Sequence, residues 1–363
     1  MSILKKKDNG KRVRFFIVYL LIYSYCMKKL KIGFTYDAKA DYKLKPGESP
    51  DKIAEFDSEE TLSEIEYSLK TSGHIIERIG NVHSLLKKVA QGKRWDLVFN
   101  IAEGIKGRNR ESQVPAILEL FDIPYSGSDA LTMGATLDKA VAKIIVSNSG
   151  ILTPKFLEIE DLSQLNKKKF HLKYPVIVKP SEEGTSKGIA QESIAHDFEH
   201  VRKRTKWLIE KYKQPALIEE FIIGSEFTVA VIENDPPLVL PPVQIAINNK
   251  TFLGENFYKH SCVFDDSIKY ICPAEIPKSL DKKLRETSYN SYKALGIRDL
   301  GRFDFRVDKD NNPYFLECNP LPNLGLIDVF PLVSKAIGIT YEEVICKILN
   351  SAIKRYGLDY TDF

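Results

Sequence analysis

Residues 301–320 contain the acidic side chains best placed to bind a metal ion. Two stretches of alternating polar and apolar residues flank a polar turn, a pattern that predicts a β-hairpin. Because strand side chains alternate between faces, Arg302 and Asp304 would share one face, and Glu317 and Asn319 would share a face on the return strand. Asp304 and Glu317 would then converge, and two carboxylates with an amide oxygen suit Mg²⁺ held between protein and phosphate. The alternative is a solvated face with cross-strand ion pairs.

A second candidate site begins where an apolar strand ends at Lys179. The loop that follows, residues 181–188, contains glycine, threonine and serine, including Thr185 and Ser186. An ammonium group beside a flexible loop can surround phosphate oxygens with positive charge and backbone N–H groups. The segment does not match the phosphate-binding loop in which the lysine follows the glycines. The alternative is an ordinary mobile loop.

The third candidate is the apolar segment 217–227, which contains two glutamates. An adenine pocket needs apolar walls and a few backbone hydrogen bonds, and a ribose needs a carboxylate. Glu219, Glu226 and the backbone near Phe221 and Ile222 could supply these groups. The alternative is a pair of edge carboxylates beside a turn.

Alternating strands and helices must position these side chains in the first part of the chain. From Lys31 onward, apolar strand patterns alternate with amphipathic helix patterns, which indicates a parallel α/β layer. The pattern predicts strands beginning at Ile32, Ile75 and Asp96, and helices near residues 58–73, 85–89 and 114–120. Asn100 and Glu103 follow the third strand, where such sheets bind ligands.

The pattern changes at about residue 128. A helix opens near Leu137, strands follow at 174–179, 216–220 and 226–232, and an amphipathic helix at 341–356 closes the fold. We therefore predict a chain of mixed α/β and α+β class. Its expected parts are a parallel α/β domain at 27–127, a small α+β domain at 128–218 and a larger α+β domain at 219–357.

Composition restricts the class of protein. The chain has 363 residues, of which 43% are apolar and 28% charged, as expected of a globular protein with a sizeable core. A net charge of +4 over this length gives no support to nucleic acid as a partner. The five cysteines contain no CxxC pair, which favours reduced thiols in a cytoplasm over a zinc site.

Residues 1–26 differ from the rest of the chain. A basic stretch precedes a short apolar run, which resembles a signal peptide, but the run is too short to span a bilayer and no typical cleavage site follows. The favoured interpretation is an upstream extension before a natural start at Met27. A membrane-associating segment and a cleaved signal are the alternatives, and we expect no membrane partner for the functional protein.

Four motifs occur in the order seen in ATP-grasp ligases. They are Lys139, then Lys179 with its glycine loop, then residues 219–226, then the hairpin residues. The chain most resembles the D-alanine–D-alanine ligase branch, with further matches at 123–128 and 319–322. The resemblance implies an ATP-grasp fold preceded by a parallel α/β (pre-ATP-grasp) domain, with three subdomains in all. It also implies a cytoplasmic enzyme that forms a homodimer.

The resemblance also implies the role of each motif. Lys139 and Lys179 would hold ATP phosphates, and Glu219 and Glu226, with Phe221 and Ile222, would contact the base and ribose. The metal ligands would be Asp304, Glu317 and Asn319, holding two Mg²⁺ ions or Mn²⁺ in their place. Thr185 and Ser186 would close over the γ-phosphate and acceptor, and Arg302 would stabilise an oxyanion. The reaction implied joins a carboxylate to an amine through an acyl phosphate, giving a dipeptide, ADP and phosphate.

The amino-acid-binding positions depart from the family pattern. The Ser-x-Glu-Arg-Glu segment has no match near 34–42, and Asn323 replaces a glycine. Asp328 stands at about the place of a serine that helps hold the second substrate's carboxylate, which an aspartate would repel. Lys259 is the candidate for a family lysine in the preceding loop. The expected substrates are small amino acids, either two D-alanines or another pair; an ATP-binding protein with little turnover is the remaining alternative.

Overall fold

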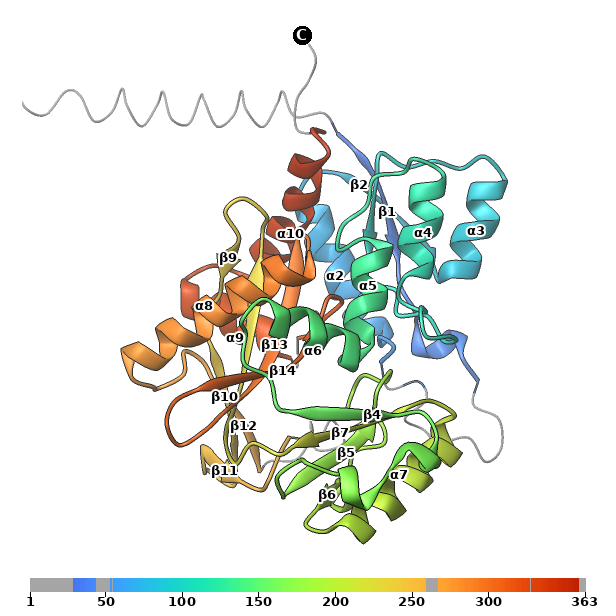
Figure 1. The fold of residues 1–363 in the computed structure, drawn as a ribbon. Helices are drawn as coiled ribbons and strands as arrows, with labels where there is room; N and C mark the ends of the chain where they lie inside the picture. The colour runs from blue at the N-terminus through green and yellow to red at the C-terminus, as the bar shows by residue number, and fades with distance from the viewer. Residues whose placement is uncertain (1–28, 44–52, 54, 259–266, 327, 359–363) are drawn as a thin grey trace, which may run out of the picture.

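The computed structural model describes residues 29–43, 53, 55–258, 267–326 and 328–358 (Figure 1). Three β-sheets follow one another along the chain, the first parallel and the other two antiparallel. The predicted extension at 1–26 and the candidate substrate residue Lys259 lie outside the described residues. Within the described part of the chain, no helix is both long and apolar enough to span a membrane.

The first sheet has the order β2–β1–β3 and is parallel, as the alternating pattern predicts. Its elements are β1 (Lys31–Thr35), η1 (Lys39–Asp41), α2 (Glu59–Thr71), β2 (Ile75–Gly80), α3 (Val82–Ala90), β3 (Leu97–Asn100) and α4 (Gln113–Leu120). The Ser58 hydroxyl accepts a hydrogen bond from the Thr61 N–H at 3.2 Å, which caps the start of α2.

The second sheet forms a lobe with its own core. Its elements are β4 (Phe156–Ile159), η3 (Leu162–Gln164), η4 (Lys167–Lys169), β5 (Val176–Pro180), η5 (Gln191–Ser193), β6 (Ile194–Ala195), α7 (Phe198–Tyr212) and β7 (Ala216–Glu220). The strand order is β4–β7–β5–β6. Every member of its hydrophobic cluster lies between residues 157 and 218. We call this part the central lobe; Figure 1 shows it at the bottom of the view, with β11 (Phe252–Gly254) and β12 (Ile268–Ile271) of the third sheet beside it.

The third sheet contains the predicted hairpin at one edge. Its strand order is β12–β10–β8–β13–β14, with β9 and β11 also paired to β8. The elements are β8 (Gly224–Ile232), β9 (Leu238–Val239), β10 (Val243–Ile247), β11 (Phe252–Gly254), β12 (Ile268–Ile271), α8 (Lys278–Leu295), β13 (Leu300–Val307), β14 (Pro313–Asn319), α9 (Val329–Ile337) and α10 (Tyr341–Arg355). Asp304 pairs with Glu317 in the register, as the alternation predicts.

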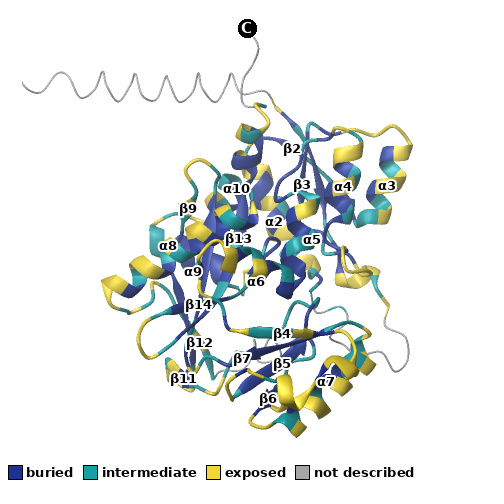
Figure 2. Cartoon of the chain, viewed as in Figure 1, coloured by how far each residue is buried: buried dark blue, intermediate teal, exposed yellow. Residues whose placement is uncertain are grey.

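The first and third sheets share one hydrophobic core. Ile32 and Phe34 of β1 belong to the same buried cluster as Ile232 of β8 and Val344 and Ile348 of α10. Figure 2 shows most of the strands buried, with β4 partly exposed, and the outward faces of the helices exposed. Because these apolar surfaces are buried against each other, the parallel layer and the third sheet form one body, to which the central lobe is attached.

The structure differs from the predicted domain boundaries at two places. β7 continues to Glu220 within the central sheet, so a boundary between 218 and 219 divides a strand. The helices α5 (Ala130–Leu137) and α6 (Lys139–Asn148) were assigned by the sequence pattern to the central domain. Instead, Ala142 and Val146 of α6 pack with Phe227 and Phe303 of the third sheet. An amphipathic helix shows that it has a partner surface but not which sheet provides it.

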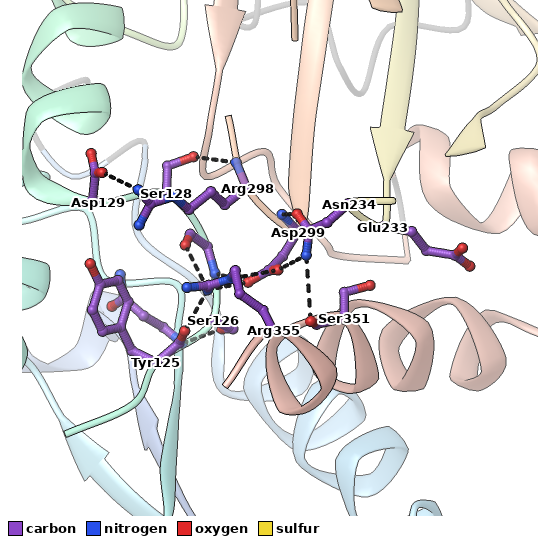
Figure 3. Close-up of polar contacts among 12 residues, drawn as sticks. Tyr125, Ser126, Ser128, Asp129, Glu233, Asn234, Arg298, Asp299, Ser351 and Arg355 are labelled. Carbon is purple, nitrogen blue, oxygen red and sulfur yellow. Dashed lines mark hydrogen bonds and ion pairs between the residues drawn. The ribbon is translucent and has the colours of Figure 1, made fainter. Parts of the chain in front are cut away.

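A buried polar network ties the parallel layer to the third sheet (Figure 3). The carboxylate of Asp299, which is fully buried, pairs with Arg355 at the end of α10 at 2.7 Å. The same carboxylate accepts hydrogen bonds from the Gly127 N–H at 2.9 Å and from Asn234 at 2.6 Å. Arg355 also donates to the carbonyl of Tyr125 at 2.8 Å. The segment 123–128, singled out in the sequence, is therefore anchored by these contacts.

Candidate functional site

Most of the predicted site residues line one pocket between the three sheets. The residues that line it include Thr185, Ser186, Lys179, Glu219, Phe221, Ile222, Glu226, Arg302, Asp304, Glu317, Asn319, Asn323 and Asp328. Lys139 reaches its edge, where its ammonium group lies 3.1 Å from Glu317. Motifs separated by up to 180 residues in the chain therefore converge on one cleft.

The paired hairpin presents two carboxylates and an amide on one face. Thr228 donates a hydrogen bond to Asp304 at 2.6 Å, and the Asn319 amide donates to the same carboxylate at 3.1 Å. Burial raises the pKa of Asp304, and the nearby Glu317 raises it further against the opposing effect of Arg302. This buried carboxylate therefore gains from a cation, and the oxygen donors of the hairpin fit Mg²⁺.

The hairpin contributes too few ligands to hold a metal ion alone. Among the described residues, no group of three or more His, Cys, Asp or Glu side chains is arranged to bind a metal. A magnesium site of two carboxylates and one amide would leave positions for phosphate oxygens and water, which is how Mg²⁺ is usually held beside nucleotides.

Lys139 connects the hairpin to the glycine loop. It is the first residue of α6, and its ammonium group donates to the backbone carbonyl of Glu183 as well as pairing with Glu317. Burial alone would raise the pKa of Glu317, but Lys139 and Lys179 outweigh it and lower that pKa. The Glu317 carboxylate therefore stays ionised next to two ammonium groups suited to phosphate oxygens.

Glu219 is buried between two lysines. Its carboxylate lies 2.6 Å from Lys179 and 2.8 Å from Lys143. Burial would raise the pKa of Glu219, but the two ammonium groups hold it at about 2, while burial lowers the pKa of Lys143 to about 8. Sequence reasoning missed Lys143, although it lies one helical turn after Lys139 and so faces the same side. In this arrangement Glu219 positions Lys179.

Arg306 organises the segment predicted to receive the base and ribose. Its guanidinium donates to the carbonyl of Ile222 at 2.9 Å and pairs with Glu226 at 3.3 Å. It also stacks over the Phe221 ring, 4.6 Å from the centroid. Burial raises the pKa of Glu226 to about 7 despite this pairing. Within the described residues the Ile222 N–H donates no hydrogen bond, so it is available to a ligand.

Arg302 lies between two carboxylates. Its guanidinium is 3.4 Å from Asp304 and 3.6 Å from Asp328. Burial would lower the pKa of Arg302, but these two carboxylates outweigh it and raise the pKa. Asp328 also caps α9 by accepting a hydrogen bond from the Val329 N–H at 2.6 Å. The aspartate therefore places a negative charge beside both the arginine and the helix N-terminus, two groups that could otherwise bind a substrate carboxylate.

The glycine loop is held against the parallel layer. Thr185 and Ser186 have positive φ values of 50° and 54°, which is a strained conformation for a β-branched threonine. Lys187 at the end of the loop pairs with Glu55 at 2.6 Å, and a Cβ on Gly184 would lie 2.5 Å from the Glu55 carboxylate. Sequence reasoning missed Glu55 because no motif or periodicity marks its segment.

Comparison with known proteins identifies relatives that match most of the chain. Residues 145–350 match the family model described as the D-ala D-ala ligase C-terminus. An uncharacterised protein of Sinorhizobium fredii, y4sG, is 34% identical over 268 residues, which are 72% of this chain and 75% of that protein. A D-alanine–D-alanine ligase of Carboxydothermus hydrogenoformans is 32% identical over 308 residues, 79% and 94% of the two chains. The Bacillus anthracis D-alanine–D-alanine ligase crystallised with ATP superimposes with a TM-score of 0.70 at 24% identity, covering 90% of this chain and 99% of that one.

Proposed function

Because the chain belongs to the D-alanine–D-alanine ligase family of ATP-grasp enzymes, we propose that it joins two small amino acids in the cleft between its three sheets. The family and fold predicted from the motifs are confirmed. The chain is an ATP-dependent, ADP-forming ligase that uses Mg²⁺. The observation that supports the placement of the site is the register of the hairpin, which sets Asp304 opposite Glu317 and beside Asn319.

We assign nucleotide binding to the two lysines and the segment after β7. Lys139 and Lys179 would contact the phosphates, since each carries an ammonium group at or beside the pocket. The Ile222 N–H and the wall at Phe221 would receive the base, and the Glu226 oxygen that Arg306 does not occupy would accept the ribose hydroxyls. Glu219 would act indirectly, by holding Lys179 in place.

Asp304, Glu317 and Asn319 would hold Mg²⁺, which when bound offsets the negative charge of the phosphates. A substrate carboxylate lying near the γ-phosphate would attack it, releasing ADP and forming an acyl phosphate. Arg302 would stabilise the oxyanion, while Thr185, Ser186 and their loop would exclude water from the acyl phosphate. An amine would then attack the acyl carbon, lose a proton and expel phosphate to give an amide.

The first candidate substrate pair is two D-alanines, the pair after which the related ligases are named. A second candidate, a different amino-acid pair, is favoured by Asp328. Its carboxylate already uses Arg302 and the start of α9, so the carboxylate of a second alanine would meet a negative charge there. Asn323 also lines this end of the pocket.

The organisation of the enzyme in the cell is also a proposal. We propose a cytoplasmic homodimer, in keeping with the family, with small-molecule substrates and no nucleic acid or membrane partner. Three parts would act together in each chain: the parallel layer from residue 27, the central lobe and the third sheet with its helices. The extension at 1–26 would precede the catalytic body.

The proposed function is tested by measuring ADP release with Mg²⁺-ATP against single and paired D- and L-amino acids. Asp304→Asn removes one negative charge from the hairpin and keeps its shape. We expect this variant to lose at least about a hundredfold in kcat, since catalytic metal ligands and their charge contribute several kcal/mol to the transition state. Its melting temperature should not fall, because burial already disfavours the ionised form. Full activity in Asp304→Asn would contradict the assigned site.

A further inference from the structure

The wall of the pocket formed by the parallel layer is acidic. Four carboxylates from this layer line the same pocket as the glycine loop and the hairpin: Glu55, Asp57, Glu103 and Glu111. Two cations lie among them. Arg110 and Lys187 each contact Glu55, at 3.5 and 2.6 Å, and each also contacts Glu183 of the loop, at 3.9 and 3.4 Å. Both cations therefore lie closer to Glu55 and Glu183 than to Glu103 and Glu111, to which no ion pair joins them.

Glu103 and Glu111 have no hydrogen-bond donor close by within the described residues, and Arg110 is the first cation whose charge acts on each of them. Neither carboxylate forms a hydrogen bond or an ion pair with any of the residues that the structure describes, although Glu111 is only 7% exposed. Burial raises the pKa of Glu103 well above its usual value and that of Glu111 to about 7, although the positive charge of Arg110 opposes the rise in both. A buried carboxylate with no donor is costly, and a ligand that supplies N–H donors and positive charge removes that cost.

The spacing of these carboxylates favours an organic cation over a metal ion. Three acidic side chains close enough to share one ion would form a metal site, and none of the described groups is arranged in that way. An ammonium group needs only one or two carboxylates within hydrogen-bond distance and can be carried on a flexible carbon chain.

A further acidic side chain, Asp328, lines the same pocket. The Asp328 carboxylate lies 3.6 Å from Arg302 and accepts a hydrogen bond from the first N–H of α9, so it offsets part of the positive charge that a substrate carboxylate would meet there. The acidic wall and Asp328 both disfavour an additional carboxylate and favour an additional amine.

We propose that this ligase takes a diamino acid as a substrate, with the side-chain ammonium group bound by Glu103 and Glu111. The inference rests on the proposed function, because it concerns the amino-acid subsite of that same cleft. It differs from that function in naming a cationic side chain, which alanine lacks.

The test compares 2,4-diaminobutyrate with 2-aminobutyrate, in D and L forms. The two amino acids share a carbon skeleton and differ by one side-chain ammonium group. Binding to the full chain with Mg²⁺ and a non-hydrolysable ATP analogue is measured by calorimetry. We expect the diamino acid to bind at least about tenfold tighter, as charge-assisted hydrogen bonds in a buried site allow. Equal binding of the two amino acids, in both configurations, would overturn the proposal.

Variants of the acidic wall test whether a preference for the diamino acid depends on Glu103 and Glu111. Glu111→Gln keeps the shape of the side chain, and we expect it to remove most of the preference while binding of 2-aminobutyrate is unchanged. Glu64→Gln, an exposed glutamate on α2, is the matched control and should keep the preference. If Glu111→Gln does not fold, Glu103→Gln makes the same test. A preference that survives both wall variants would overturn the assignment.

Measuring ADP release as well as binding distinguishes a failure of the diamino-acid subsite from a failure of the proposed ligase function. ADP release with neutral amino acids, and no binding preference for the diamino acid, would overturn the diamino-acid subsite and keep the ligase of small amino acids. A binding preference that depends on Glu111, but no ADP release with any amino acid, would support the subsite and contradict the proposed ligation.

Discussion

At the scale of single residues, charge pairing decides which groups can bind a ligand. Glu219 and Glu226 look equivalent in the sequence, as two glutamates in one strand-turn-strand segment. The structure pairs Glu219 with two buried lysines. In Glu226, Arg306 at 3.3 Å and the Tyr258 N–H at 3.2 Å contact the same carboxylate oxygen. The first holds other side chains in position, and the second keeps an oxygen for a ligand.

Glu219→Gln should destabilise the protein. The neutral amide leaves the ammonium groups of Lys143 and Lys179 buried without a counter-charge, which costs about 3–5 kcal/mol in the free energy of unfolding. Urea denaturation measures this loss. Glu220→Gln is the control, because Glu220 is half-buried and, among the described residues, its carboxylate accepts a hydrogen bond only from the Lys173 N–H, at 3.0 Å. Similar losses in the two variants would contradict the role assigned to Glu219.

The lowered pKa of Glu219 predicts that the stability of the protein depends on pH. The folded-state pKa of Glu219 is about 2, below the value of about 4.3 expected in the unfolded chain. Its contribution to stability is therefore complete above about pH 5 and is lost as the pH falls through about 2. The Glu219→Gln variant should show a smaller decrease in stability over this range, measured by urea denaturation at several pH values.

At the scale of elements, helix starts place the phosphate-binding side chains. Asp138 caps α6 by accepting a hydrogen bond from the Val141 N–H at 3.0 Å, and the next residue is Lys139. Asp129 caps α5 in the same way, through the Thr132 N–H at 2.9 Å. The two caps are alike in chemistry, but only the first directly precedes a residue of the site.

Removing each of the two caps by substitution gives a matched pair of variants. Asp138→Ala and Asp129→Ala should each lower the free energy of unfolding by about 1 kcal/mol, the usual contribution of an N-cap. Only Asp138→Ala should also raise the KM for ATP, because Lys139 would no longer be held at 3.1 Å from Glu317. Thermal unfolding and ADP-release kinetics measure both effects. An equal change of KM in both variants would show that α6 does not position the lysine in this way.

At the scale of the whole molecule, the parallel layer and the third sheet behave as one body. They share a hydrophobic core, and Asp299 and Arg355 join them through the contacts seen in Figure 3. The net charge of +4 gives no indication that the pocket between these parts is lined by acidic side chains. The distribution of charge, and not its sum, sets what the cleft attracts.

Arg355→Met should weaken the contact between these two parts. It leaves the buried Asp299 carboxylate with hydrogen bonds but without its counter-charge, which costs about 3–5 kcal/mol. Arg298→Met is the control, because its ion pair with Asp129 at 2.8 Å is partly exposed and contributes about 1 kcal/mol or less. Urea denaturation compares the two, and equal losses would contradict the role of the network.

The sequence by itself determined the features that depend on neighbours along the chain. Strand alternation placed Asp304 opposite Glu317, and the order of the motifs identified the family. Only the tertiary structure brought Glu55 to Lys187, Lys143 to Glu219 and α6 to the third sheet. Periodicity records which face of an element is buried, but it does not record which distant element covers that face. The partners of a buried charge are therefore decided when the chain folds.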